Sequence, residues 1–137
     1  MGTRRLGREL ALQALYALDI NPMDTHRFLA TFWENNPSPA EARTFAGQLI
    51  EGIISHRVDL DALIKSKAQH WALSRMALVD LNLIRLAAYE LLYRDDIPKK
   101  VIINEAIEIA KKFGSEDSPA FVNGILDGIP VPEGKAE

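Results

Sequence analysis

The sequence contains no cysteine, which excludes disulfide bonds, cysteine-ligated zinc sites and thiol chemistry. It also lacks an apolar run of about 18 residues, the length that a membrane-spanning helix requires, and no apolar signal segment follows the amino-terminal arginines. No stretch alternates apolar and polar residues, so we predict no strands. These absences indicate a soluble, cytoplasmic, all-helical protein.

An excess of positive charge is also missing, because 16 Lys and Arg stand against 19 Asp and Glu, for a net charge of −3. A protein that coats nucleic acid over its whole surface is usually strongly basic, so any such contact here must be a local patch. The three histidines are far apart, and no nucleophile lies beside a base. We therefore expect no metal, no cofactor and no enzymatic activity.

Apolar residues recur at spacings of three and four between proline and glycine, and this pattern predicts seven helices. We expect one domain over residues 1–130 and a flexible tail at residues 131–137, where proline, glycine and charged residues gather. The first, fifth and sixth helices are predicted at Thr3–Ile20, 78–94 and 101–113.

Helix starts have their own sequence signals. Ser38 followed by Glu41 is typical of a capping box, with Pro39 at the first position of the third helix. Asp59 is the predicted cap of the fourth helix, and Ser118 that of the seventh. Gly47 and Gly52 are spaced as in a phosphate-binding loop, but the lysine of that motif is absent, so we interpret them as close helix-packing points.

The first helix has a polar side that suggests a ligand. At about 100° per residue, the side away from its apolar stripe presents Arg5, Arg8, Leu12 and Tyr16, with Gln13 at the margin. Proteins hold single-stranded RNA in this manner, with guanidinium groups on phosphates and aromatic rings on unpaired bases. The alternative is an ordinary solvated helix whose tyrosine packs against a neighbour.

A second candidate site is the polar segment at residues 115–121, before the last helix. It offers free backbone N–H groups and Phe121, while Lys111 and Lys112 precede it. The alternative is a capping segment in which Phe121 borders the core and the lysines pair with Glu108.

Several blocks then resemble a known family, in order and at its spacing. They are the basic opening stretch at 4–16, IRLAAYEL at 84–91, INEAIEIAK at 103–111 and FVNGILD at 121–127. Over nearly its whole length the chain is similar to the NusB family of bacterial transcription antitermination factors. The resemblance implies a seven-helix fold of two packed helical bundles, the first formed by the first three helices.

The resemblance also implies partners. Proteins of this family bind NusE, a ribosomal protein of the small subunit, and together they hold boxA, a single-stranded element of the nascent transcript. The complex joins RNA polymerase with NusA and NusG and suppresses premature termination, notably in ribosomal RNA operons. The implied RNA contacts are Arg4, Arg5, Arg8, Gln13, Tyr16, Lys112, Asp117 and Phe121, and the implied NusE contacts are Asp80, Arg85, Tyr89 and Glu90.

Two other interpretations stay open. The same fold forms an amino-terminal domain of some ribosomal RNA cytosine methyltransferases, although this chain ends where their catalytic domain would begin. A protein-only scaffold, homodimeric through its first or fifth helix, would agree better with the net negative charge.

Overall fold

The computed structural model describes residues 2–68 and 71–135, and within them it contains seven α-helices and no strand, as predicted. A short 3-10 turn, η1 (Leu73–Arg75), precedes the fifth helix. The helices are α1 (Thr3–Ile20), α2 (Thr25–Asn35), α3 (Ala40–Ser55), α4 (Arg57–Lys67), α5 (Leu78–Tyr93), α6 (Lys99–Phe113) and α7 (Ser118–Asp127).

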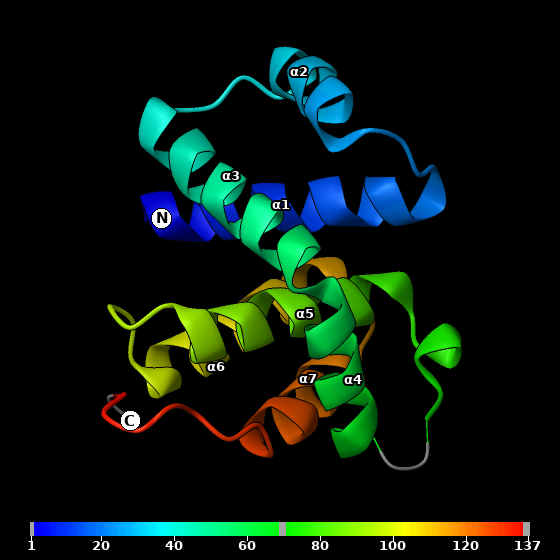
Figure 1. Cartoon of the computed structure of the whole chain (residues 1–137), viewed down its shortest axis with the longest axis vertical. Coiled ribbons are helices and arrows are strands. Elements are labelled where there is room, and N and C mark those ends of the chain that lie inside the picture. The colour runs from blue at the N-terminus through cyan, green and yellow to red at the C-terminus, as the bar shows by residue number, and fades with distance from the viewer. Residues whose placement is uncertain (1, 69–70, 136–137) are drawn as a thin grey trace.

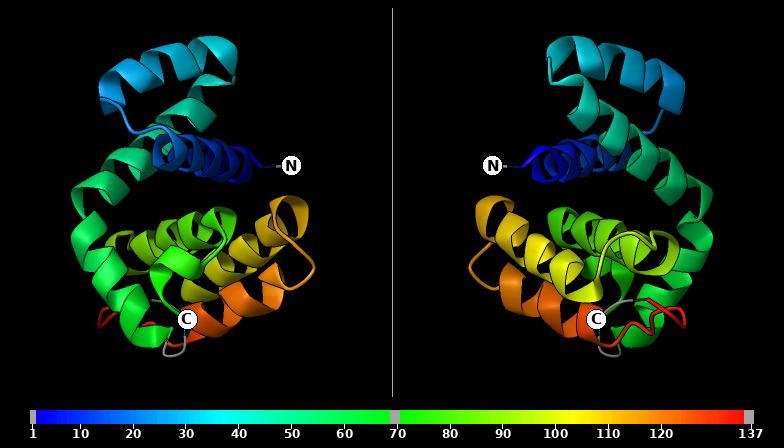
Figure 2. Two further views of the ribbon diagram at one scale, coloured as in Figure 1. Left: turned by 90° about the vertical axis from the view of Figure 1, so that its right-hand side faces the viewer. Right: turned by 90° about the vertical axis from the view of Figure 1, so that its left-hand side faces the viewer.

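The helices form two bundles. Figure 1 shows α1, α2 and α3 at one end of the molecule and α5, α6 and α7 at the other, with α4 running along the second bundle. The side views in Figure 2 show the same division, and α1 contacts both α3 and α5. The helix α1 is therefore covered on two faces, one by its own bundle and one by the other.

Small residues let α1 and α3 approach closely. Ala11 and Ala14 of α1, like Ala42 and Ala46 of α3, have no accessible surface. A methyl group on Gly7 would lie 2.8 Å from Cδ2 of Phe45 and 3.0 Å from the Ala42 carbonyl oxygen. Gly7 is thus a position where the two helices leave no room for a side chain.

The two glycines that we interpreted as packing points differ. Gly52 is one, because a methyl group there would overlap the Tyr89 ring. The prediction for Gly47 is wrong, since no atom lies within 4 Å of a methyl group at that position.

The three predicted helix caps are wrong, by one residue for Ser38 and Ser118 and by three for Asp59. Pro39 has an extended backbone and is itself the residue before α3, so Ser38 lies too far out to cap and its hydroxyl donates to the Asn36 carbonyl. Only His56 separates α3 from α4, which places Asp59 inside the first turn of α4. The residue before α7 is Asp117, and the buried Ser118 hydroxyl accepts the Ser115 N–H instead.

The sixth helix begins at Lys99, two residues before its predicted start. Near the carboxyl end of the chain, the Lys135 ammonium donates to the carbonyl oxygens of Glu90 and Arg94, at the end of α5. Residues 136–137 of the predicted tail lie outside the described residues.

The contact between α1 and α3 yields a matched test. We expect Gly7→Ala to lower the free energy of unfolding by about 1–3 kcal/mol, because the methyl group forces the two helices apart. Gly47→Ala should raise it by up to about 1 kcal/mol, since alanine favours a helix over glycine and nothing obstructs it. Urea denaturation of both variants measures the difference, and equal effects would contradict the packing described here.

Candidate nucleic-acid interface

The predicted RNA contact Arg8 lies inside the protein, between the two bundles. Its side chain is 4% exposed and holds the Glu90 carboxylate through two nitrogens, with Nε–Oε2 at 2.9 Å and Nη2–Oε1 at 2.8 Å. A third nitrogen lies 3.4 Å from Oε1 of Glu105. The prediction that Arg8 faces solvent is wrong, as it is for the buried Leu12, because the second bundle covers this face of α1.

Two of the predicted NusE contacts are also internal. Glu90 of α5 is 1% exposed and fully engaged by Arg8. Arg85 is buried and binds Asp19 of α1 at 2.9 Å and Asp61 of α4 at 2.7 Å. Both side chains are buried in internal ion pairs, so a partner could reach either one only by displacing such a pair.

The other two predicted NusE contacts are less enclosed than these. Tyr89 is half-buried against Gly52 and stacks on Tyr93, with ring centroids 5.2 Å apart. Asp80 is buried in the first turn of α5 and belongs to a pocket described below.

The remaining cations of α1 are accessible and form replaceable ion pairs. Arg4 is exposed and binds Asp96 at 3.0 Å, but Asp96 also has Arg94 as a partner at 3.2 Å. Arg5 is half-buried and binds Glu105 through two nitrogens. The hydrogen bond from Arg5 lowers the pKa of Glu105, and burial of the carboxylate opposes this effect.

A second carboxylate, that of Glu9, also joins α1 to α6. The Lys112 ammonium lies 2.9 Å from Oε1 of the buried Glu9, and the Gln13 amide donates to the Glu9 carbonyl at 3.2 Å. Tyr16, one turn further along α1, is 38% exposed. We refer to Arg4, Arg5, Gln13, Tyr16 and Lys112 as the α1–α6 strip.

The other predicted contacts lie at a separate pocket of about 210 Å³. Asp117 is exposed, Phe121 is half-buried, and the Phe121 ring meets the edge of the Trp71 ring with centroids 6.2 Å apart. Tyr16 is not among the residues that line this pocket. Its lining consists of Trp71, Arg75, Met76, Ala77, Asp80, Asp117 and Phe121.

Sequence reasoning missed Trp71, Arg75 and the place of Asp80 in this pocket. The signal that the sequence offers for this pocket is Trp71, an aromatic residue in a polar stretch without helical periodicity. Because no helix is predicted there, the sequence does not indicate which residues would neighbour Trp71.

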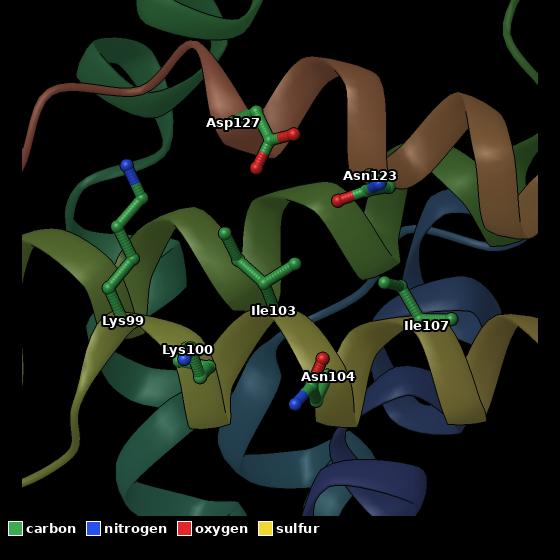
Figure 3. Close-up of a pocket in the computed structure, with 7 residues that line it drawn as sticks. All are labelled: Lys99, Lys100, Ile103, Asn104, Ile107, Asn123 and Asp127. Atoms are coloured by element: carbon green, nitrogen blue, oxygen red, sulfur yellow. The ribbon is translucent and has the colours of Figure 1, made fainter. Parts of the chain in front are cut away.

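A larger hollow of about 480 Å³ lies between α6 and α7 and contains none of the predicted contacts. In Figure 3, Ile103 and Ile107 lie between the polar side chains of the two helices. Those polar side chains are Lys99, Lys100 and Asn104 on α6, with Asn123 and Asp127 on α7.

Among the residues that the structure describes, no three His, Asp or Glu side chains are placed to share a metal ion. Within the same residues, no helix has the length and apolar character needed to cross a membrane.

The described residues form an all-helical fold of two bundles, and accessible cations with one exposed tyrosine on α1 and α6 are its candidate binding surface. The model of the NusB family matches residues 5–130, so the chain belongs to the NusB family. The transcription antitermination protein NusB of Geobacter sulfurreducens is 54% identical over 130 residues, with 94% of each chain covered.

Solved structures agree with this assignment. T. maritima NusB superposes with a TM-score of 0.86 at 37% identity, over 98% of this chain and 96% of that one. A structure of the antitermination factors NusB and NusE in complex with double-stranded RNA matches with a TM-score of 0.84 at 24% identity. The match covers 94% of this chain and 96% of that one, and it shows the fold.

The pairing of Arg5 with Glu105 predicts a loss of stability in acid. The pKa of Glu105 lies below its usual value of 4.5 in the folded chain, so its contribution is fully present above pH 4.5 and is lost as the pH falls through the lower folded value. Urea denaturation between pH 7 and pH 3 measures the free energy of unfolding, and its decrease in acid should be smaller in Glu105→Gln than in the unmodified chain. The exposed Glu116→Gln is the control, and identical profiles for all three proteins would contradict the assignment.

Proposed function

We propose that this chain is a transcription antitermination factor that binds boxA-type single-stranded RNA in the nascent transcript together with NusE. It acts with RNA polymerase, NusA and NusG to keep transcription of ribosomal RNA operons processive. Support comes from membership of the NusB family and from the matching structure in which a NusB is bound to NusE and RNA. The observation in this chain that favours RNA most is the α1–α6 strip.

The strip suits phosphates because its cations can bind them without leaving a buried carboxylate unpaired. If Arg4 turns to a phosphate, Asp96 keeps Arg94, and if Arg5 does so, Glu105 keeps Arg8. Lys112 can stay on Glu9, since an ammonium has three donors and its side chain is 55% exposed.

Aromatic rings supply base contacts at two places. Tyr16 lies on α1 beyond Gln13, and Phe121 borders the pocket at the start of α7. Stacking on such rings tolerates any base, so base identity must be determined by polar groups nearby.

The proposed NusE surface differs from the charged surface that the resemblance implies, because Arg85 and Glu90 are internal. Apolar side chains are exposed near the end of α5, where the His56 and Tyr93 rings lie at a tilted angle with centroids 4.1 Å apart. Val58, two residues after His56, is 83% exposed. Exposed apolar patches mark protein contacts, so we assign NusE to His56, Val58 and Tyr93, the α4–α5 patch.

The first test separates phosphate contacts from base contacts. If Arg4, Arg5 and Lys112 each contact a phosphate, the slope of log K against log salt for single-stranded RNA should be about −2, and each change to alanine should flatten it by about 0.7. Tyr16→Ala and Phe121→Ala should instead cost about 1–3 kcal/mol at an unchanged slope.

Filter binding over a range of salt concentrations measures both quantities. Lys100→Ala is the matched control, because Lys100 lies at the other end of α6 from Lys112, in the hollow of Figure 3. A slope that changes for Lys100→Ala and for none of the strip cations would place the RNA over the hollow instead.

The second test concerns the partner surface. We expect Val58→Glu to weaken NusE binding at least tenfold, because a charge replaces an apolar side chain that the contact would bury. RNA binding by the isolated chain should not change. The control is Val101→Glu on α6, another exposed valine. Titration calorimetry that gives the same NusE affinity for both variants and the unmodified chain would remove NusE from the α4–α5 patch.

A further inference from the structure

Trp71 and Phe121 form an aromatic wall between the segment that precedes α5 and the start of α7. The two rings meet at an interplanar angle of 78°, with centroids 6.2 Å apart. Both rings line the pocket of about 210 Å³ on one side of this wall and a second hollow of about 310 Å³ on the other. Trp71 is 53% exposed, so the wall leaves a large aromatic surface open to solvent.

The two sides of the Trp71–Phe121 wall differ in charge. On the first side, the exposed Asp117 and the buried Asp80 accompany one cation, Arg75. On the second side, Lys67 lines the hollow and no carboxylate of the described residues does. A ligand with a negatively charged backbone is therefore favoured on the second side.

The floor of the second hollow is small and apolar. Besides the two rings, its lining consists of Lys67, Ala68, Ala120, Gly124 and Ile125. A methyl group on Gly124 would meet no atom within 4 Å, although this glycine lies inside α7. Glycine weakens a helix interior relative to alanine, but it lets a ligand approach the backbone closely.

We propose that Trp71 is a base-stacking residue. One unpaired base of the RNA lies against the Trp71–Phe121 wall on the Lys67 side, and Lys67 binds a phosphate of the same strand. Single-stranded RNA is held by this combination of an aromatic ring and a neighbouring cation, and a hollow of this volume falls in the range of small-ligand sites, roughly 300–1,000 Å³. The inference rests on the proposed RNA-binding function and adds Trp71 and Lys67 to the contacts that the resemblance implies.

Tryptophan fluorescence tests the stacking contact, because Trp33 and Trp71 are the two tryptophans of the chain. In Trp33→Phe the emission comes from Trp71 alone, and we expect a saturating single-stranded oligoadenylate at low salt to quench it. Trp71→Phe is the matched control. Its emission comes from Trp33 on α2, at the other end of the molecule from α7 (Figure 1), and should not change.

Binding measurements with the same strand test both parts of the contact. Trp71→Ala should weaken binding about tenfold at an unchanged salt slope, whereas Trp71→Phe should keep most of the affinity because it keeps a ring. Lys67→Ala should flatten the slope of log K against log salt by about 0.7, because its contact adds to those of the α1–α6 strip. Arg75→Ala removes a cation from the other side of the wall and should leave the slope unchanged.

A third pair of variants tests the hollow itself. Gly124→Leu should weaken RNA binding, because the leucine side chain would occupy the space that the base requires. Gly47→Leu is the control, since a methyl group at Gly47 also meets no atom within 4 Å but this glycine lies on α3. It should bind RNA as the unmodified chain does.

Other results would overturn the inference in distinguishable ways. Unchanged Trp71 emission in the presence of bound RNA, or full affinity in both Trp71→Ala and Gly124→Leu, would overturn the stacking contact and leave RNA binding elsewhere intact. A slope flattened by Arg75→Ala and not by Lys67→Ala would overturn the assignment to the Lys67 side. Quenching of Trp71 by NusE and not by RNA would assign the wall to the protein partner. No binding of any strand at low salt would overturn both this inference and the proposed function.

Discussion

The buried ion pair between Arg8 and Glu90 is the constraint on which the arrangement of the two bundles depends. Replacing a buried pair by apolar residues is often neutral for stability, but removing one partner leaves a buried charge and costs about 3–5 kcal/mol. The pair therefore fixes how α1 sits on α5 more than it adds stability. Arg8 also contacts Glu105 of α6, and the ion pair of Lys112 with Glu9 joins α6 to α1 a second time. This placement sets Arg5 beside Glu105 of α6 and Lys112 beside Glu9 of α1.

The strip also shows how a chain with net negative charge can offer a site for RNA. Each accessible arginine is held by a carboxylate that has a second cation, so a phosphate can replace the carboxylate without unpairing it. The arginines are thus oriented before any ligand arrives, and the number of phosphate contacts stays small. A small number of contacts gives modest affinity, which agrees with the proposal that RNA is bound together with a partner.

The fold could be predicted from the sequence, because periodicity and proline placement define helices locally, and the bounds of α1 agree with the prediction. The site could be predicted in part. Arg8 and Glu90 are 82 residues apart, and each looks like a surface residue on its own helix, so a projection of one helix cannot reveal that they pair. Trp71 was missed for the related reason that its neighbours, Phe121 and Asp80, come from other elements. Ser38 failed as a cap because Pro39 remains extended.

Whether Arg8 is an internal ion-pair partner and not an RNA contact is tested most directly in two variants, Arg8→Met and Arg8→Met/Glu90→Leu. For each variant, the free energy of unfolding and the salt dependence of RNA binding are measured. We expect the single change to destabilise the chain and the double change to restore most of the loss. The double variant should bind single-stranded RNA with an unchanged slope of log K against log salt. A double variant of normal stability whose slope is flatter by about 0.7 would show that Arg8 contacts a phosphate, and would contradict the account.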